Sequence, residues 1–217
     1  TGTLAPALLV PVIDQLAEAL AAVHAEGIVH RDVKPSNVFL HGAGARVKLL
    51  DFGIAKLLAP DPGDDALVTT ATTHLGTPDA MAPEQIRGGA IDARTDVYGL
   101  GVLTFHLLSG RLPFEDESPT IVQYLHAHAR RPKVSGHAPL PAPVDDVVAK
   151  AMAIDPAQRY PDARSFVTAL RAALLDRDGV DDELVPRPAV AVLVEVRADD
   201  AAMEEPDEAL LADLEAL

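Results

Sequence analysis

The stretch DVYGLGVLTFHLLSG, residues 96–110, most constrains how this chain can fold. It is apolar on almost every side of a helix, so other elements must surround it at the centre of a domain. Similar helical patterns, separated by proline-rich turns, follow near 118–129, 143–153 and 162–175. The sequence therefore predicts a helical layer built around one central helix.

The residues before this layer mix one helix with short strands. Pro11 and the following VIDQLAEALAAVHAEG predict a helix that begins at the proline and ends at Gly27. Short runs predict strands at 28–30, 38–40 and 46–50, the last two joined by the turn-like HGAG. Residues 59–75 have no period and predict a long loop. The expected fold class is α+β, mainly α.

Composition and charge exclude several classes of function. Residues 1–175 contain 19 acidic and 15 basic side chains (net -4), and residues 176–217 contain 14 and 3 (net -11). Neither part offers a basic patch, which argues against a nucleic-acid or anionic-membrane partner. The chain has no cysteine, so we expect a reducing compartment, the cytoplasm. We also expect no membrane segment, since no apolar run appears long enough to span a bilayer.

Three ordered motifs point to a chemistry. HRDxKxxN occupies residues 30–37, DFG begins fourteen residues after its asparagine at 51–53, and APE follows at 82–84. This set resembles the protein kinase family, specifically the bacterial serine/threonine kinases that look like eukaryotic ones. The resemblance covers roughly residues 5–175 and is to the C-terminal lobe, with short β-hairpins around the catalytic loop.

The resemblance implies catalytic roles for four residues. Asp32 would orient the attacking hydroxyl and accept its proton, and Lys34 would lie against the transferring phosphate of ATP. Asn37 and Asp51 would hold Mg²⁺, which prefers oxygen ligands. Taken without their spacing, Asp32, Lys34 and Asn37 could form an ordinary capped surface turn. The joint spacing of the three motifs disfavours that interpretation.

Further positions resemble residues with structural roles in the family: His30, Phe52, Gly53, Glu84, Asp96 and Arg159. His30 and Phe52 would stack in a hydrophobic column that links two lobes. Asp96 would accept hydrogen bonds from the catalytic-loop backbone. Glu84 and Arg159 would form a buried ion pair that tethers the end of the activation segment, although exposed positions are the usual place for both residue types.

Residues 51–84 resemble an activation segment. Arg31, directly before Asp32, is typical of kinases whose segment is ordered by phosphorylation, because a guanidinium pairs well with a phosphate. The candidate acceptors are Thr69, Thr70, Thr72 and Thr73. Thr77 resembles the threonine that bridges the catalytic aspartate and lysine. The family usually has an aromatic residue where this chain has Ala80, which puts the substrate-docking surface in doubt.

His126 and His128 suggest a metal site at first sight. Two residues apart on a helix, they face different directions, so we expect two solvated side chains instead.

The expected function is ATP- and Mg²⁺-dependent phosphorylation of serine and threonine hydroxyls on protein substrates. The family's glycine-rich loop, strand lysine and helix glutamate do not occur in this chain and would precede Thr1, so we expect the chain alone to be inactive. Two alternatives stay open. One is a pseudokinase or scaffold lobe, against which the intact catalytic set speaks. The other is a small-molecule phosphotransferase, against which the APE motif, the threonine cluster and Arg31 speak.

The expected domain organisation has three parts. Residues 1–175 form the kinase C-terminal lobe, and residues 176–186 form an acidic linker. Residues 187–217 alternate valines in a predicted strand and then line one helix face with leucines. We expect this last part to begin a second, truncated domain. An acidic tail without fixed structure is the alternative.

Overall fold

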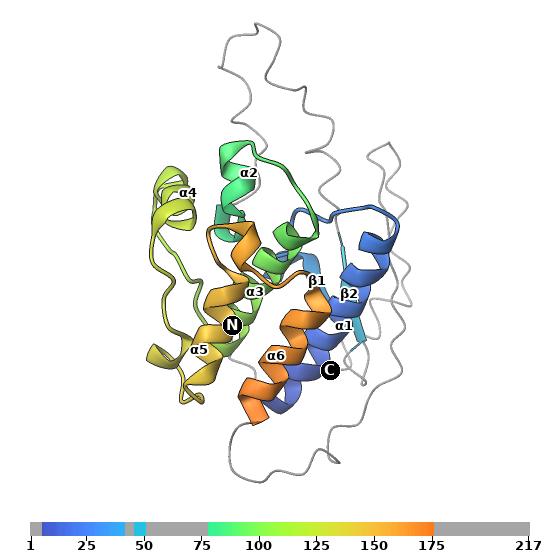
Figure 1. Ribbon diagram of the computed structural model, residues 1–217. Coiled ribbons are helices and arrows are strands. Elements are labelled where there is room, and N and C mark those ends of the chain that lie inside the picture. The colour runs from blue at the N-terminus through green and yellow to red at the C-terminus, as the bar shows by residue number, and fades with distance from the viewer. Residues whose placement is uncertain (1–5, 42–45, 51–77, 176–217) are drawn as a thin grey trace, which may run out of the picture.

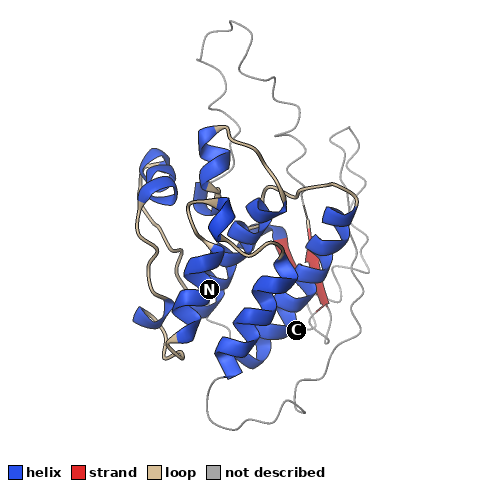
Figure 2. Ribbon diagram, viewed as in Figure 1, coloured by secondary structure: helices blue, strands red, loops and turns tan. Residues whose placement is uncertain are grey.

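The computed structural model describes residues 6–41, 46–50 and 78–175. This part of the chain forms six α-helices and one two-stranded sheet (Figures 1 and 2). Four short 3-10 turns connect these elements, at Pro35–Asn37, Pro78–Ala80, Val134–Gly136 and Pro156–Gln158. The mainly helical α+β class predicted from the sequence is confirmed.

Helix α3 (Ala93–Ser109) is the central element of the described fold. It begins where the Asp92 side chain accepts a hydrogen bond from the Arg94 amide, at 2.8 Å. It ends at Gly110, whose φ of 71° is the left-handed conformation that glycine adopts without strain. Thirteen of its residues are buried, on every side of the helix. The predicted central helix is confirmed.

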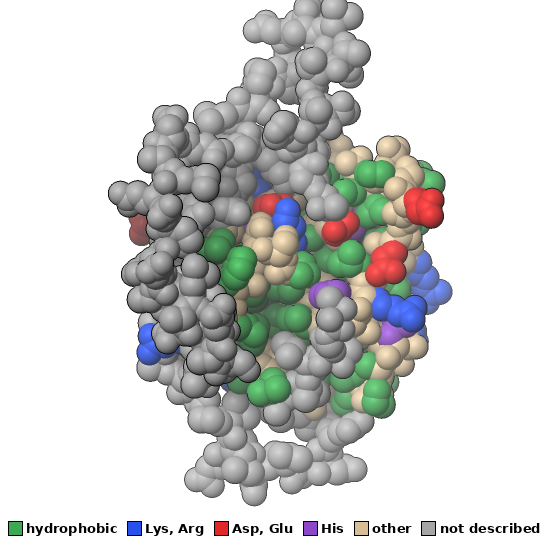
Figure 3. Space-filling view, turned by 180° about the vertical axis from the view of Figure 1, so that it is seen from behind, with side chains coloured by type: hydrophobic (Ala, Val, Ile, Leu, Met, Phe, Trp, Pro, Cys, Tyr) green, Lys and Arg blue, Asp and Glu red, His purple; other side chains and the backbone are tan. Residues whose placement is uncertain are grey.

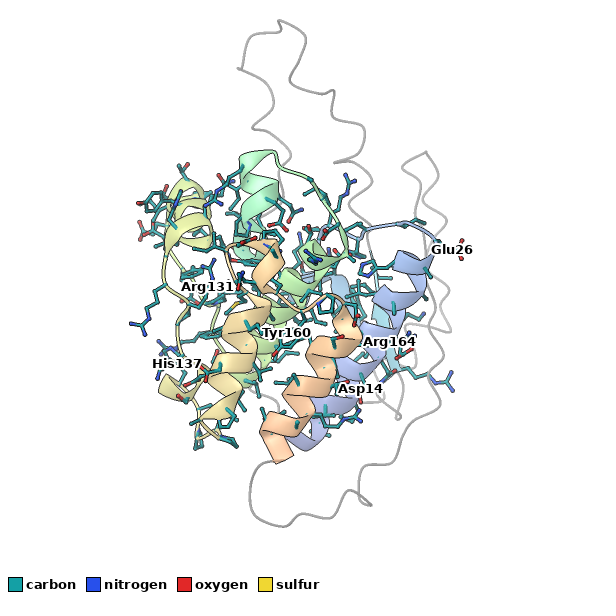
Figure 4. The ribbon with its side chains drawn as sticks, in the orientation of Figure 1. Asp14, Glu26, Arg131, His137, Tyr160 and Arg164 are labelled. Carbon is teal, nitrogen blue, oxygen red and sulfur yellow. The ribbon has the colours of Figure 1, made fainter. Side chains whose placement is uncertain are left out.

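Helices α1 (Pro6–Ala25) and α6 (Ala163–Leu175) lie side by side in front of α3, and α5 (Pro143–Ala151) packs against α3 and α6 (Figure 1). Ion pairs join α1 and α6 at the surface. Arg164 binds Glu18 at 2.7 Å, and Arg171 binds Asp14. Figure 4 labels Asp14 and Arg164 on these two facing helices.

Helix α1 begins five residues before the position predicted from the sequence. Pro11 lies inside the helix, so one backbone hydrogen bond to the preceding turn is missing. Leu9 and Val10, which precede the proline, are nonetheless buried in the core. Burial of this extra turn accounts for a start at Pro6, since tertiary packing rather than local propensity decides most helix boundaries.

By length and composition, residues Leu8–Ala25 of α1 form the one described helix that could cross a membrane. From the sequence we expected no apolar run of this length. Core helices of globular domains meet the same criterion, and Ile13, Leu16 and Leu20 of α1 are fully buried against the rest of the fold.

Strands β1 (Val38–His41) and β2 (Arg46–Leu49) pair in antiparallel fashion, with Val38 opposite Leu49. They confirm the predicted strands at 38–40 and 46–50. Val47 and Leu49 are buried in the core, and β2 packs against α1. Phe39 and Leu40 of β1 are 50% and 54% exposed. Hydrophobic side chains also gather in the middle of the face seen from behind (Figure 3).

The strand predicted at 28–30 is wrong, because these residues form an irregular connection. Their backbone groups have partners other than a neighbouring strand. The Ile28 amide donates to the Val23 carbonyl at 3.0 Å, and the His30 amide donates to a side chain of α3. The apolar run therefore connects α1 to the loop that follows it.

Helices α2 (Pro83–Arg87) and α4 (Pro119–His128) lie together on the far side of α3 from α1 (Figure 1). The Arg87 guanidinium donates to the Ala127 carbonyl at 2.6 Å. The helices predicted near 118–129, 143–153 and 162–175 correspond to α4, α5 and α6.

One histidine of α4 is not solvated as the sequence predicted. His128 is exposed as expected, but His126 is fully buried, and its Nδ1 lies 2.7 Å from the Tyr98 hydroxyl. The Phe114 ring packs edge-on against it at 5.0 Å between ring centres. The sequence could not show this, because Tyr98 and Phe114 come from elsewhere in the chain. Among the described residues no His, Cys, Asp and Glu cluster that could hold a metal occurs.

The burial of His126 predicts a pH dependence of stability. Burial first, and the nearby charge of Arg131 second, lowers the pKa of His126 from 6.5 to about 4. Below the unfolded pKa the unfolded chain gains a proton that the fold excludes. The free energy of unfolding should therefore be highest above about pH 6.5 and should fall by roughly 3 kcal/mol as the pH drops to about 4.

Urea unfolding at a series of pH values measures this effect. His126→Gln should show a shallower loss of stability with acid than the unchanged chain. His128→Gln, at the exposed position two residues away, serves as the control and should keep the original slope. Equal slopes in all three proteins would contradict the assignment to His126.

Candidate active site

The loop of residues 30–37 lies directly on α3 because Gly99 leaves room for it. A Cβ atom at position 99 would lie 2.8 Å from the Val33 carbonyl oxygen and 2.9 Å from the Val33 Cβ. Both separations are too short for a real contact, so any larger residue would push the loop away from the helix. Val33 itself is buried. Val33 thus anchors the loop in the core.

Asp96, in the first turn of α3, fixes the start of this loop. Its carboxylate is 1% exposed and accepts hydrogen bonds from the backbone amides of His30, at 2.8 Å, and Arg31, at 2.7 Å. The ring of His24, at the end of α1, contacts the same carboxylate at 2.7 Å. A buried carboxylate needs such partners, because its desolvation is costly. These hydrogen bonds tie the start of α3 to the loop of residues 30–37.

Arg31 has a φ of 68°, the only positive value among the described non-glycine residues. For a residue with a side chain this left-handed conformation costs about 1–2 kcal/mol. It persists only where surrounding contacts fix it, and such strain concentrates at functional sites. The strained residue immediately precedes Asp32, the predicted catalytic base.

Asp32, Lys34 and Asn37 come together as one cluster. A single Asp32 oxygen, Oδ2, lies 2.9 Å from the Lys34 ammonium and accepts from the Asn37 amide nitrogen at 2.9 Å. The same Asn37 nitrogen donates to the Asp32 carbonyl at 2.8 Å. Pro35 begins the 3-10 turn that brings Asn37 back toward Asp32. The Asp32 and Lys34 side chains are 21% and 14% exposed, so the cluster is oriented by contacts yet open to solvent.

The next connection joins this cluster to the hairpin. The Leu50 amide donates to the Asn37 carbonyl at 2.9 Å. The fully buried ring of His30 contacts the Leu50 carbonyl at 3.1 Å. The end of β2 is therefore bonded to both ends of the catalytic loop.

Several predicted site residues lie outside the described residues: Asp51, Phe52, Gly53, Thr69, Thr70, Thr72, Thr73 and Thr77. Leu50, directly before the first of them, is described. Ala80, where the family usually has an aromatic, is partly buried in the turn Pro78–Ala80. The predicted strand and helix of 187–217 also lie outside the described residues.

Glu84 of α2 and Arg159 form a buried ion pair. The guanidinium donates to both carboxylate oxygens, each at 2.7 Å, and Thr95 of α3 adds a third hydrogen bond to Glu84 at 2.8 Å. Burial alone would raise the pKa of Glu84, but the hydrogen bonds and charge of Arg159 outweigh burial and hold that pKa below its usual value. The pair fastens α2 to the central helix.

Sequence reasoning missed three residues that support this site: His24, Gln85 and Thr95. His24 and Thr95 contact predicted residues, as described above. The Gln85 side chain donates to the Arg31 carbonyl at 2.8 Å and accepts from the Ala82 amide at 2.9 Å. The position of Gln85 directly after the APE motif was the one available signal. Nothing in the sequence pattern links these residues to partners 11–72 positions away.

Comparison with known proteins places this geometry in a family. The family model described as protein kinase domain matches residues 1–169 of the sequence. The chain belongs to the protein kinase family. It is 42% identical over 198 residues to the serine/threonine-protein kinase Pkn1 of Myxococcus xanthus, covering 88% of this chain and 27% of that one. It is 41% identical over 160 residues to PknB of Mycobacterium tuberculosis, covering 73% and 25%.

A solved kinase structure agrees with these relatives. The kinase domain of Mycobacterium tuberculosis PknI superimposes with a TM-score of 0.61 at 30% identity, over 79% of this chain and 57% of that one. The interpretation as a bacterial kinase of the eukaryotic-like type, and as a C-lobe-like fold, is confirmed. The chain spans about a quarter of the length of the curated relatives named here.

The buried Glu84–Arg159 ion pair should contribute strongly to stability. Arg159→Leu leaves the Glu84 carboxylate buried without its cation, so the free energy of unfolding should fall by about 3–5 kcal/mol. Arg164→Leu is the matched control, because it breaks an arginine–glutamate pair whose side chains are 60% and 43% exposed. That change should cost less than about 1 kcal/mol. Urea unfolding measures both, and equal losses would contradict a buried structural role for Arg159.

Proposed function

We propose that the full-length protein transfers the terminal phosphate of ATP to serine and threonine hydroxyls of protein substrates. The cluster of Asp32, Lys34 and Asn37 carries this proposal. On a single loop, the Asp32 carboxylate lies 2.9 Å from the Lys34 ammonium and 2.9 Å from the Asn37 carboxamide nitrogen. The chain's membership of the protein kinase family supports phosphoryl transfer as the chemistry of this cluster.

Each side chain has a role that its chemistry suits. In phosphoryl transfer the protein mainly positions the reactants and neutralises charge. The Asp32 carboxylate would accept a hydrogen bond from the substrate hydroxyl and then its proton. The Lys34 ammonium, now paired with Asp32, would face the negative charge on the transferring phosphoryl group. The contacts from Asn37 keep the Asp32 carboxylate in one orientation.

The residues present fit a magnesium ion. The hydrogen bonds of the Asn37 side chain use its amide nitrogen, and no described donor contacts its amide oxygen. That oxygen is a ligand type that Mg²⁺ prefers. Asn37 and Asp51, the second of which lies outside the described residues, would hold the ion. When bound it would neutralise charge on the phosphates of ATP.

We expect this chain alone to transfer no phosphate, because the glycine-rich loop and strand lysine of the family do not occur in it. The half-exposed Phe39 and Leu40 of β1 support this, because they leave an apolar surface directly after Asn37. The proposed location of the protein is the cytoplasm.

Control by phosphorylation is part of the proposal. The Arg31 Nε atom is buried and has no hydrogen-bond partner within the described residues. Guanidinium nitrogens are well suited to bind a phosphate. A phosphothreonine at Thr69, Thr70, Thr72 or Thr73 is the proposed partner.

The decisive experiment changes the proposed base. In the full-length protein, Asp32→Asn should lower the rate of phosphate transfer to a protein substrate by about 10²–10⁴-fold, because the amide cannot accept the proton. Transfer from labelled ATP in the presence of Mg²⁺ measures the rate. Asp146→Asn, at an exposed position of α5, makes the same chemical change away from the site and should leave the rate unchanged.

The outcomes separate the candidate functions. A folded Asp32→Asn protein with a near-normal rate would contradict the proposed mechanism. If the full-length protein without substitutions bound partner proteins but transferred no phosphate, it would be a scaffold. Transfer to a small-molecule hydroxyl and to no protein would identify a small-molecule phosphotransferase.

A further inference from the structure

The Gln85 side chain makes hydrogen bonds to two different segments of the chain. Its Oε1 accepts from the amide of Ala82 at 2.9 Å, which satisfies one of the free amides at the start of α2. Its Nε2 donates to the Arg31 carbonyl at 2.8 Å, across 54 positions of sequence. The first bond belongs to a helix cap. The second reaches the backbone of the catalytic loop.

The carbonyl that Gln85 contacts belongs to the peptide group that joins Arg31 to Asp32. The conformation of Arg31 is strained, with its φ of 68°, and the loop would relax without outside contacts. Asp96, on α3, accepts a hydrogen bond from the Arg31 amide at 2.7 Å. Gln85 fixes its carbonyl from α2. The strained residue is therefore bonded on both sides, by two different helices.

We propose that Gln85 is a positioning residue, which couples the placement of α2 to the orientation of the peptide group that carries Asp32. This inference rests on the proposed kinase function. Glu84, the preceding residue, ties α2 to Arg159 and Thr95. A displacement of α2 would thus withdraw the donor from the Arg31 carbonyl and free the peptide group before the base to rotate. In this role Gln85 acts through the backbone of Arg31.

The alternative is that Gln85 only caps α2. Two substitutions separate these roles. Gln85→Glu keeps an acceptor oxygen for the Ala82 amide, as glutamate commonly does at this helix position, but places an acceptor against the Arg31 carbonyl. Gln85→Leu removes both hydrogen bonds. Gln158→Glu adds the same charge at an exposed position and serves as the control.

The experiment measures kinetics, stability and amide exchange in the full-length protein. Gln85→Glu should lower kcat between about 10-fold and 100-fold, the range for a displaced catalytic group. The KM for ATP should change little, because Gln85 contacts none of the residues proposed to hold ATP. The thermal midpoint should match that of Gln158→Glu, whereas Gln85→Leu should lower both kcat and the thermal midpoint. The Asp32 amide should exchange with solvent several-fold faster in Gln85→Glu.

Two results would overturn the inference. One is a Gln85→Glu protein whose kcat and Asp32 amide exchange both equal those of the Gln158→Glu control, which would leave capping as the role of Gln85. The other is a Gln85→Glu protein as unstable as Gln85→Leu, which would assign the donor to the stability of the fold. An unchanged protein without any transfer activity would contradict the proposed function instead. In that case the exchange measurement alone decides about Gln85.

Discussion

The rest of the site depends on the hydrogen bonds that the buried Asp96 carboxylate accepts from the loop backbone. This carboxylate lies at the start of the central helix, where almost no solvent reaches it, and a charge in that position is unstable without partners. Two backbone amides of the catalytic loop and the ring of His24 supply them. The loop therefore cannot leave the helix without stranding the carboxylate. Asp96 thus fixes the start of the loop to α3.

A second support comes from α2. Its Glu84 is joined to Arg159 and to Thr95 of α3, and its next residue bonds the Arg31 carbonyl. Together the two helices fix a backbone conformation that Arg31 would not adopt alone. The next residue is Asp32, whose side chain lies beside Lys34 and Asn37. The backbone directly before the side chains proposed to act on ATP is thus held by α3 and α2.

Much of this arrangement could be predicted from sequence because it is local. The all-round apolar pattern of 96–110 predicted the central helix, and the runs around HGAG predicted the hairpin. The motif spacing predicted that Asp32, Lys34 and Asn37 share one loop, where the structure brings them together. Long-range contacts were different. Sequence periodicity did not predict that Gln85 bonds Arg31 or that Tyr98 contacts the buried His126. It also did not predict that residues 28–30 bond to helices instead of a strand.

Residue-resolved amide hydrogen exchange at His30 and Arg31 tests the role of Asp96 most directly. If the carboxylate holds the loop, both amides should exchange as slowly as those in the middle of α3. In Asp96→Asn, which offers one acceptor oxygen in place of two, at least one of them should exchange much faster while the α3 amides stay protected. Equal protection of both amides in the two proteins would show that the loop is held by other contacts.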